Sequence, residues 1–322
     1  GWRTADFDDS AWDAAQVLRG RISDRPPAVT PWSRLVPRDI PFMEEREVAP
    51  ERIERVDEVL DLANRLRAED LSTGLSTVGQ PVRHSAARNV DALAGACGEA
   101  VFQSSTEHQD RVFDGIYDPC VVLDFGRVLT AYPRLALEGP AGSVVELGYA
   151  ERLIDGHFNN AIEGQFADRC TLAGGAMVYE PFTWKAFRYL KLRFRNAQEP
   201  VTVRSVTAKV TTYPYEERGG FTSSDETLNQ VFAISRNTLR LCSNEFLMDT
   251  PWREQAQWLG DVAAVTLGGI YACFGDARLP GKFLRQAAAN AFPTGLLANV
   301  SNSVSHGWPG VIPDYSLWWV MG

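Results

Sequence analysis

The side chains best suited to chemistry lie together in residues 249–261, which read Asp-Thr-Pro-Trp-Arg-Glu-Gln-Ala-Gln-Trp-Leu-Gly-Asp. This segment contains three carboxylates, one guanidinium and two indole rings. Such a set can protonate a leaving group and can hold a hydroxyl-rich ligand by hydrogen bonding and ring stacking. Pro251 and Gly260 disfavour a regular helix, so we expect a loop displayed at the end of a helical scaffold.

Acid catalysis by this segment requires one carboxyl group that stays protonated near neutral pH. Glu254 lies close in sequence to Trp252 and Trp258, and apolar neighbours of this kind raise the pKa of a carboxyl group. Asp249 and Asp261 can then stay ionised and bind hydroxyl groups. The composition therefore nominates Glu254 as the proton donor of a candidate site.

A plain structural interpretation of the same segment competes with the catalytic one. In that interpretation Asp261 caps the following helix and Arg253 forms an exposed ion pair. Charged surface loops are common, so composition alone favours this alternative.

Helical patterns flank the segment and would position it. Ser223 and Glu226 have the spacing of a capping box and open an apolar stripe, which consists of Leu228, Val231, Phe232 and Leu239. A second helix is expected from about 261 to 274, where Gly275 stops it, and a third over about 280–292.

Upstream, the hydrophobic period falls to two and β-branched residues accumulate. This pattern predicts an antiparallel β-sandwich over residues 118–215. Its clearest expected strands are 121–125, 144–149, 190–194 and 201–212. Turn signals separate them, at Glu138-Gly139-Pro140, Asp155-Gly156 and Ala173-Gly174-Gly175.

The first third of the sequence is less regular. Residues 1–42 are rich in Trp, Pro and Asp, and we expect them to be the tail of a preceding domain followed by an extended connector. Residues 43–117 are predicted to form a partly helical insertion. That prediction rests on an amphipathic pattern over 52–65, where Ile53, Val56, Val59 and Leu60 recur at helical spacing, and on a second possible helix near 90–101.

Composition excludes several classes of function. The 322 residues carry 32 Lys and Arg against 41 Asp and Glu, a net charge of −9, so we expect no nucleic-acid partner. The longest apolar run, 262–274, is too short to span a bilayer, so we expect no membrane partner. The five cysteines and four histidines show no metal-ligand spacing, and we expect no metal and no cofactor. Scattered thiols and the lack of a visible leader favour a cytoplasmic protein, and the oligomeric state stays open.

The segment 249–261 resembles the signature of bacterial α-L-rhamnosidases, glycoside hydrolase family 78. In that family an Asp-x-Pro-x-Arg loop, ending in Trp-x-Gly-Asp, enters an (α/α)6 barrel. Other stretches are similar to the same family in the same order. They are 7–12 (end of an N-terminal jelly-roll domain), 123–126 and 148–153 (concanavalin-like sandwich), 182–189 (strand before the barrel) and 312–319 (later barrel segment).

The resemblance implies a role for each residue of the motif. Glu254 matches the glutamate that donates a proton to the leaving group, and Trp258 matches an aromatic wall beside the sugar. Asp249, Arg253 and Asp261 match positions that bind rhamnose hydroxyls. Family members invert the anomeric centre, which requires a second carboxylate about 6.5–9.5 Å away to activate water.

The resemblance also implies a multidomain β + α fold, with a concanavalin-like sandwich followed by an (α/α)6 barrel. About twelve helices and their loops need on the order of 190 residues, so residues 216–322 are expected to hold only the first helices of an incomplete barrel. We therefore expect the general base to lie beyond this sequence and the sequence alone to be inactive. The expected substrate is a rhamnose-containing glycoside or oligosaccharide. A non-catalytic carbohydrate-binding protein and a barrel glycosidase for another sugar remain alternatives.

Overall fold

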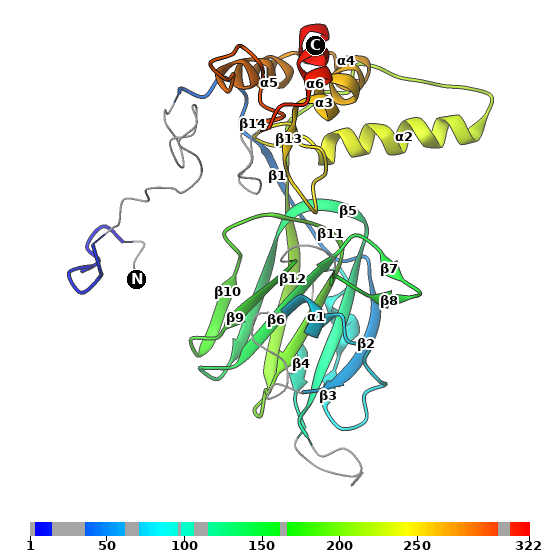
Figure 1. Ribbon diagram of the computed structural model, residues 1–322. Coiled ribbons are helices and arrows are strands. Elements are labelled where there is room, and N and C mark those ends of the chain that lie inside the picture. Colours follow the sequence, from blue (N-terminus) through cyan, green and yellow to red (C-terminus); the bar gives the residue numbers. More distant parts are fainter. Residues whose placement is uncertain are drawn as a thin grey trace.

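The protein consists of a β-rich body with a group of helices at one end (Figure 1). The computed structural model describes residues 4–14, 36–61, 71–95, 98–105, 115–161, 166–301 and 310–322. The strands are β1 (Glu44–Val48), β2 (Arg52–Leu60), β3 (Ala86–Arg88), β4 (Ala100–Gln103), β5 (Tyr117–Gly139), β6 (Val144–Ala150), β7 (Leu153–Ile154), β8 (His157–Phe158), β9 (Ala167–Thr171), β10 (Gly175–Tyr179), β11 (Lys185–Arg195), β12 (Val201–Thr212), β13 (Gln257–Trp258) and β14 (Val300–Ser301). The helices are α1 (Leu71–Leu75), η1 (Val90–Leu93), α2 (Glu226–Leu241), α3 (Leu259–Asp261), the π-helical η2 (Val262–Thr266), α4 (Leu267–Phe274), α5 (Arg278–Ala289) and α6 (Pro313–Met321).

The long strand β5 organises the β domain. Its first part pairs with β2, its second part pairs with β12 and β10, and β11 pairs with both parts, always antiparallel. Gly126 lies between the two parts with a positive φ of 76°, a conformation that favours glycine. Strands β4, β5, β6, β11 and β12 enclose one hydrophobic core, which confirms the predicted sandwich and its four clearest strands.

The predicted helix over 52–65 is wrong, because residues 52–60 form strand β2, paired with β5. The register shifts between Ile53 and Arg55, as a β-bulge does, and this shift changes which residues share a face. Ile53 and Val56, three residues apart, therefore both pack on the sandwich core. A bulged strand thus produced the spacing that is typical of a helix.

The region expected to be a partly helical insertion contributes four strands to the sheet. Strand β1 pairs with β12, and β3 and β4 extend the sheet beyond β12. The second expected helix, near 90–101, is a single 3₁₀ turn, η1, followed by strand β4. The helical content described in residues 43–117 is limited to α1 and η1 within the part of that region that the structure covers.

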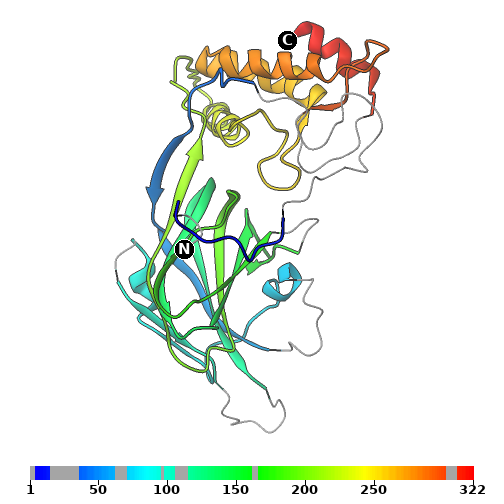
Figure 2. The ribbon, with the colours of Figure 1, turned by 90° about the vertical axis from the view of Figure 1, so that its left-hand side faces the viewer.

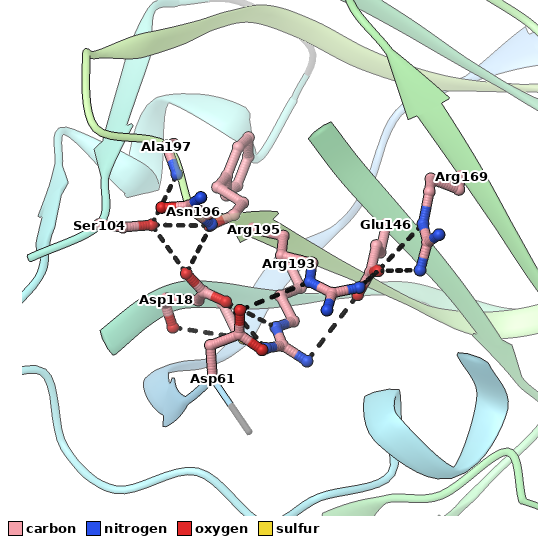
Figure 3. Close-up of polar contacts among 11 residues, drawn as sticks. Asp61, Ser104, Asp118, Glu146, Arg169, Arg193, Arg195, Asn196 and Ala197 are labelled. Atoms are coloured by element: carbon pink, nitrogen blue, oxygen red, sulfur yellow. Dashed lines mark hydrogen bonds and ion pairs between the residues drawn. The ribbon is translucent and has the colours of Figure 1, made fainter. Parts of the chain in front are cut away.

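Arginines and carboxylates form a buried network on the sheet face opposite the sandwich core (Figure 3). Arg193 is the central cation and lies within ion-pair distance of Asp61, Asp118 and Glu146. Asp118 is fully buried and also accepts hydrogen bonds from the hydroxyl of Ser104 and from a backbone amide, both at 2.8 Å. Every one of these charges is paired, as burial in a low-dielectric interior requires.

The helices pack around a second hydrophobic core. Leu259, Phe274 and Phe283 are completely buried in it, and they come from α3, α4 and α5. The predicted helices near 261–274 and 280–292 are confirmed, and Gly275 ends the first in a left-handed conformation. Within the described helices, none is long and apolar enough to cross a membrane. The four described cysteines are free and buried.

Helix α2 differs from its prediction in two respects. Its N-cap is Asp225, whose Oδ1 accepts from the backbone amide of Thr227 at 2.8 Å, and Ser223 instead accepts from the amide of Asp225 at 3.1 Å. Its apolar stripe is mostly exposed, because Leu228 and Val231 lie at the surface and no residue of α2 is buried.

Candidate active site

The predicted catalytic segment is a loop closed by its own hydrogen bonds. The amide of Asp249 donates to the carbonyl of Ala256 at 2.9 Å, and the amide of Ala256 donates back to Oδ1 of Asp249 at 3.0 Å. Between them residues 251–254 form a turn, and Gln255 takes a positive φ of 50°. The two ends of the loop therefore stay together, and the predicted non-helical conformation is confirmed for residues 249–256. It is wrong for residues 259–261, which form α3 with Gly260 inside the helix.

Contacts on two sides anchor the loop. After it, strand β13 pairs with β14, which places the loop beside residues 299–301 of the helical part. Within it, the ring of Trp252 lies 4.5 Å from the ring of Phe166 and packs against the sandwich core. The loop is thus held between the β domain and the helices (Figure 2).

Glu254 is the hub of the polar contacts in the loop. Its Oε2 accepts a hydrogen bond of 2.6 Å from the indole Nε1 of Trp258. Its Oε1 pairs with Arg253, and a further hydrogen bond joins its carboxyl group to that of Asp249. The side chain of Glu254 is 18% exposed and that of Arg253 is 51% exposed, so the carboxyl group is partly covered but reachable from solvent.

The ionisation of the two carboxyl groups is the reverse of the prediction. Burial, together with the charge of the neighbouring Glu254 carboxylate, raises the pKa of Asp249 to about 6. Burial also acts to raise the pKa of Glu254, but hydrogen bonds from Trp258 and Asp249 and the charge of Arg253 outweigh it, and the pKa falls below its usual value. When this pair binds one proton, at a pH below about 6, the proton therefore lies on Asp249.

Orientation of the two indoles explains why the prediction failed. Trp258 presents its polar N–H to Glu254 and thereby stabilises the anion. Trp252 presents its ring to Phe166. A tryptophan near a carboxyl group in sequence raises its pKa only where the apolar ring faces it.

Replacing Asp249 with asparagine is expected to stabilise the fold at neutral pH. Because the folded pKa of Asp249 is raised to about 6, this carboxyl favours folding below pH 3.8 and loses that contribution as pH rises through 6. The amide removes the buried charge and can keep the bonds to Ala256 and Glu254. We expect the variant to exceed wild type in unfolding free energy by about 1 kcal/mol at pH 7, after allowance for solvent screening, and to match it at pH 4. Urea denaturation at both pH values measures this, and a variant less stable at pH 7 would contradict it.

Asp261, the last residue of the segment 249–261, has a different partner. It belongs to α3, whose N-cap is Trp258, so the alternative in which Asp261 caps the helix is wrong. Its Oδ2 accepts a hydrogen bond of 3.2 Å from the hydroxyl of Tyr315 in α6. The ring of Tyr315 lies directly over Gly260, where any Cβ atom would overlap it.

The Gly260→Ala change tests this contact. The added methyl group would overlap ring carbons of Tyr315 and push the ring away from Asp261, so we expect a loss of about 1–3 kcal/mol in unfolding free energy. Gly268→Ala is the matched control, since a Cβ there meets no atom within 4 Å and alanine favours helix. Urea denaturation of both variants gives the comparison. Equal stabilities would show that Tyr315 does not require a glycine beneath it.

The structure thus brings four of the five candidate residues into direct contact, namely Asp249, Arg253, Glu254 and Trp258. Asp261 is held separately by Tyr315, a residue that sequence reasoning did not select. The sequence feature that could have pointed to Tyr315 was the similarity of residues 312–319 to a barrel segment of the family. Across the described ranges, no group of three or more His, Cys, Asp or Glu side chains is placed to hold a metal ion.

Comparison with known proteins identifies two domains. The profile of the bacterial alpha-L-rhamnosidase concanavalin-like domain matches residues 116–212, and that of the bacterial alpha-L-rhamnosidase 6 hairpin glycosidase domain matches residues 216–321. Among curated proteins, an alpha-L-rhamnosidase of Formosa agariphila is 24% identical over 160 residues, which cover 47% of this chain and 17% of that protein.

Two solved structures support the same assignment. A GH78 family rhamnosidase of Bacillus sp. GL1 is 26% identical with a TM-score of 0.60, over 76% of this chain and 24% of that one. The Streptomyces avermitilis alpha-L-rhamnosidase complexed with L-rhamnose is 28% identical with a TM-score of 0.50, over 57% of this chain and 18% of that one. The chain therefore spans between 17% and 24% of the length of these relatives. Both matched domains, in this order and on this fold, show that the chain belongs to the bacterial α-L-rhamnosidases of glycoside hydrolase family 78.

Proposed function

We propose that the protein carrying this chain hydrolyses terminal α-L-rhamnosides with inversion of the anomeric carbon, and that Glu254 donates the proton to the leaving group. One observation carries the proposal, the hydrogen-bonded pair of carboxyl groups in the loop 249–261. A pair of this kind keeps a proton to a higher pH than a single exposed carboxyl group does. Membership of the rhamnosidase family supports the choice of reaction.

In the protonated form of the pair, the proton starts on Asp249 and is relayed to Glu254. When a sugar covers the partly exposed Glu254, water is displaced and the pKa of its carboxyl group rises. The hydrogen bond from Asp249 then delivers the proton to Glu254, which passes it to the glycosidic oxygen as the bond to the anomeric carbon breaks. Asp249 ends this step ionised, close to the positive charge that develops on the sugar ring.

Inversion also needs a carboxylate that activates water on the opposite face of the ring, about 6.5–9.5 Å from the acid. Asp249 cannot fill this role, because it is hydrogen-bonded to Glu254 and leaves no room for water and sugar between them. The base therefore lies outside the loop. Arg253, Asp261 and Asp249 are proposed to bind rhamnose hydroxyls, with the Trp258 ring as a wall of the pocket.

The reaction is tested by incubating the protein that carries this sequence with a panel of nitrophenyl glycosides. We expect release of nitrophenol from the α-L-rhamnoside, with β-L-rhamnose as the first product by NMR. If nitrophenol is released only from the glycoside of another sugar, that sugar and not rhamnose is the substrate. If α-L-rhamnose is the first product, the inverting mechanism is rejected. Rhamnose binding by calorimetry without release from any glycoside would instead favour a non-catalytic binding protein.

A further inference from the structure

A groove of about 460 Å³ lies between α2 and the nearest end of the β domain. One wall is the C-terminal half of α2, from Ala233 to Leu241. The other wall is formed by β1, the end of β12 and the residues of β5 that follow Gly126. Figure 2 shows α2 end-on above the tips of β1 and β12. No residue of the loop 249–261 lines the groove, so it is a separate site.

Arginines dominate the charge of this groove. Arg46, Arg127, Arg236 and Arg240 line it, against two carboxylates, Glu44 and Glu217. This positive excess is local, because the chain as a whole carries a net charge of −9. A basic concavity on an acidic protein attracts anions to that place and not to the surface in general.

Two of the four guanidiniums are already neutralised in part. Glu217 pairs with Arg236 at 2.9 Å and with Arg240 at 3.1 Å, so one carboxylate serves two cations. Arg46 and Arg127 are exposed, and they have no hydrogen-bond or ion-pair partner among the residues that the structure describes. Both side chains line the groove, and no described residue competes with a ligand for their donors.

The remaining lining suits a polar molecule of moderate size. Asn237 and Thr212 contribute an amide and a hydroxyl group, which can bind sugar hydroxyls. The volume lies in the range of small-molecule pockets and exceeds what an inorganic oxyanion fills. Guanidinium groups bind carboxylate and sulfate by paired N–H donors.

We propose that this groove binds an acidic sugar, whose carboxylate or sulfate group is held by Arg46 and Arg127 and whose hydroxyl groups reach Asn237 and Thr212. The proposal is independent of the glycosidase function, since no residue of the groove belongs to the catalytic loop. It predicts that the negative charge of the sugar determines how tightly the sugar binds. An added salt should weaken this binding, because the groove is open to solvent and its ion pairs are screened.

Calorimetry with three sugars at low ionic strength tests the proposal. We expect glucuronic acid and glucose 6-sulfate to bind at least about tenfold more tightly than glucose, the order of one charge-assisted hydrogen bond. Whichever of the two acids binds more tightly decides between a carboxylate and a sulfate ligand. Inorganic sulfate is the fourth probe, and binding as tight as that of the sugars would reject the sugar part of the proposal.

Variants locate the binding in the groove. Arg127→Gln is expected to weaken binding of the acidic sugars about tenfold and to leave glucose unaffected. Arg88→Gln is the matched control, an exposed arginine on β3 at the far end of the β domain (Figure 1), and should bind as wild type does. Arg46→Gln provides a second test if Arg127→Gln fails to fold. Acids that bind no better than glucose, or equal losses in the Arg127 and Arg88 variants, would overturn the proposal.

Discussion

Replacing Glu254 with glutamine is expected to lower the turnover of α-L-rhamnosides by about 10²- to 10⁴-fold, the usual contribution of a general acid. The amide has no proton to donate to a leaving group. Its carbonyl oxygen can still accept the hydrogen bond from the indole of Trp258, which the glutamate accepts at 2.6 Å. Binding of rhamnose should therefore change little, and the loss should appear in kcat and not in KM.

The choice of leaving group separates a chemical role from a structural one. A nitrophenolate leaves without much protonation, whereas an alkyl alcohol depends on the acid, so the Glu254→Gln loss should be larger for an alkyl rhamnoside. Glu199→Gln, an exposed carboxylate on a turn of the sandwich, is the matched control and should retain wild-type turnover. Near-normal turnover by Glu254→Gln on the alkyl rhamnoside would remove Glu254 from the mechanism.

The second large effect concerns stability. Arg193→Met is expected to cost about 3–5 kcal/mol of unfolding free energy, because it leaves buried carboxylates without their cation. The guanidinium donates to Asp118 at 2.8 and 3.1 Å and to Asp61 at 3.1 Å (Figure 3). Burial already raises the pKa of Asp118 with the arginine in place, so removal of the arginine should raise it further.

Urea denaturation at two pH values identifies the cause of that loss. If unpaired carboxylates destabilise the variant, acid that protonates them should reduce its deficit, which we expect to be smaller at pH 4.5 than at pH 7. Arg204→Met is the matched control, since it breaks ion pairs with Glu99 and Glu138 that lie at the surface, and it should cost far less than Arg193→Met. A deficit that does not change with pH would indicate lost packing of the arginine side chain.

The main elements could be predicted where one periodicity dominates. The strands at 144–149 and 201–212 alternate with few exceptions, and the helix ending at Gly275 has a glycine that takes the left-handed conformation of a helix end. Strand β2 could not be predicted from the sequence, since its bulge moves Ile53 and Val56 to the same face. Which residues share a face depends on pairing with β5, whose partner residues lie 57 to 72 positions away in the sequence.

The catalytic loop shows a similar limit. Sequence motifs selected Asp249 and Glu254, and the structure places them in contact. Which of the two holds the proton depends on where the N–H of Trp258 points and on the depth of Asp249, and neither is encoded by spacing. The contact of Tyr315 with Asp261 joins residues that are far apart in the chain, so it emerges only from the packing of α6 on α3.

The ring contact between Trp252 and Phe166 has a consequence for engineering. The loop that carries the candidate acid rests on an aromatic side chain from the β domain, so the two domains are not interchangeable modules. A chimera that takes its β domain from another family member should keep a ring at the position of Phe166 if the loop is to retain its shape. Recombination between relatives would on this view succeed most often when both aromatic residues are inherited from the same parent.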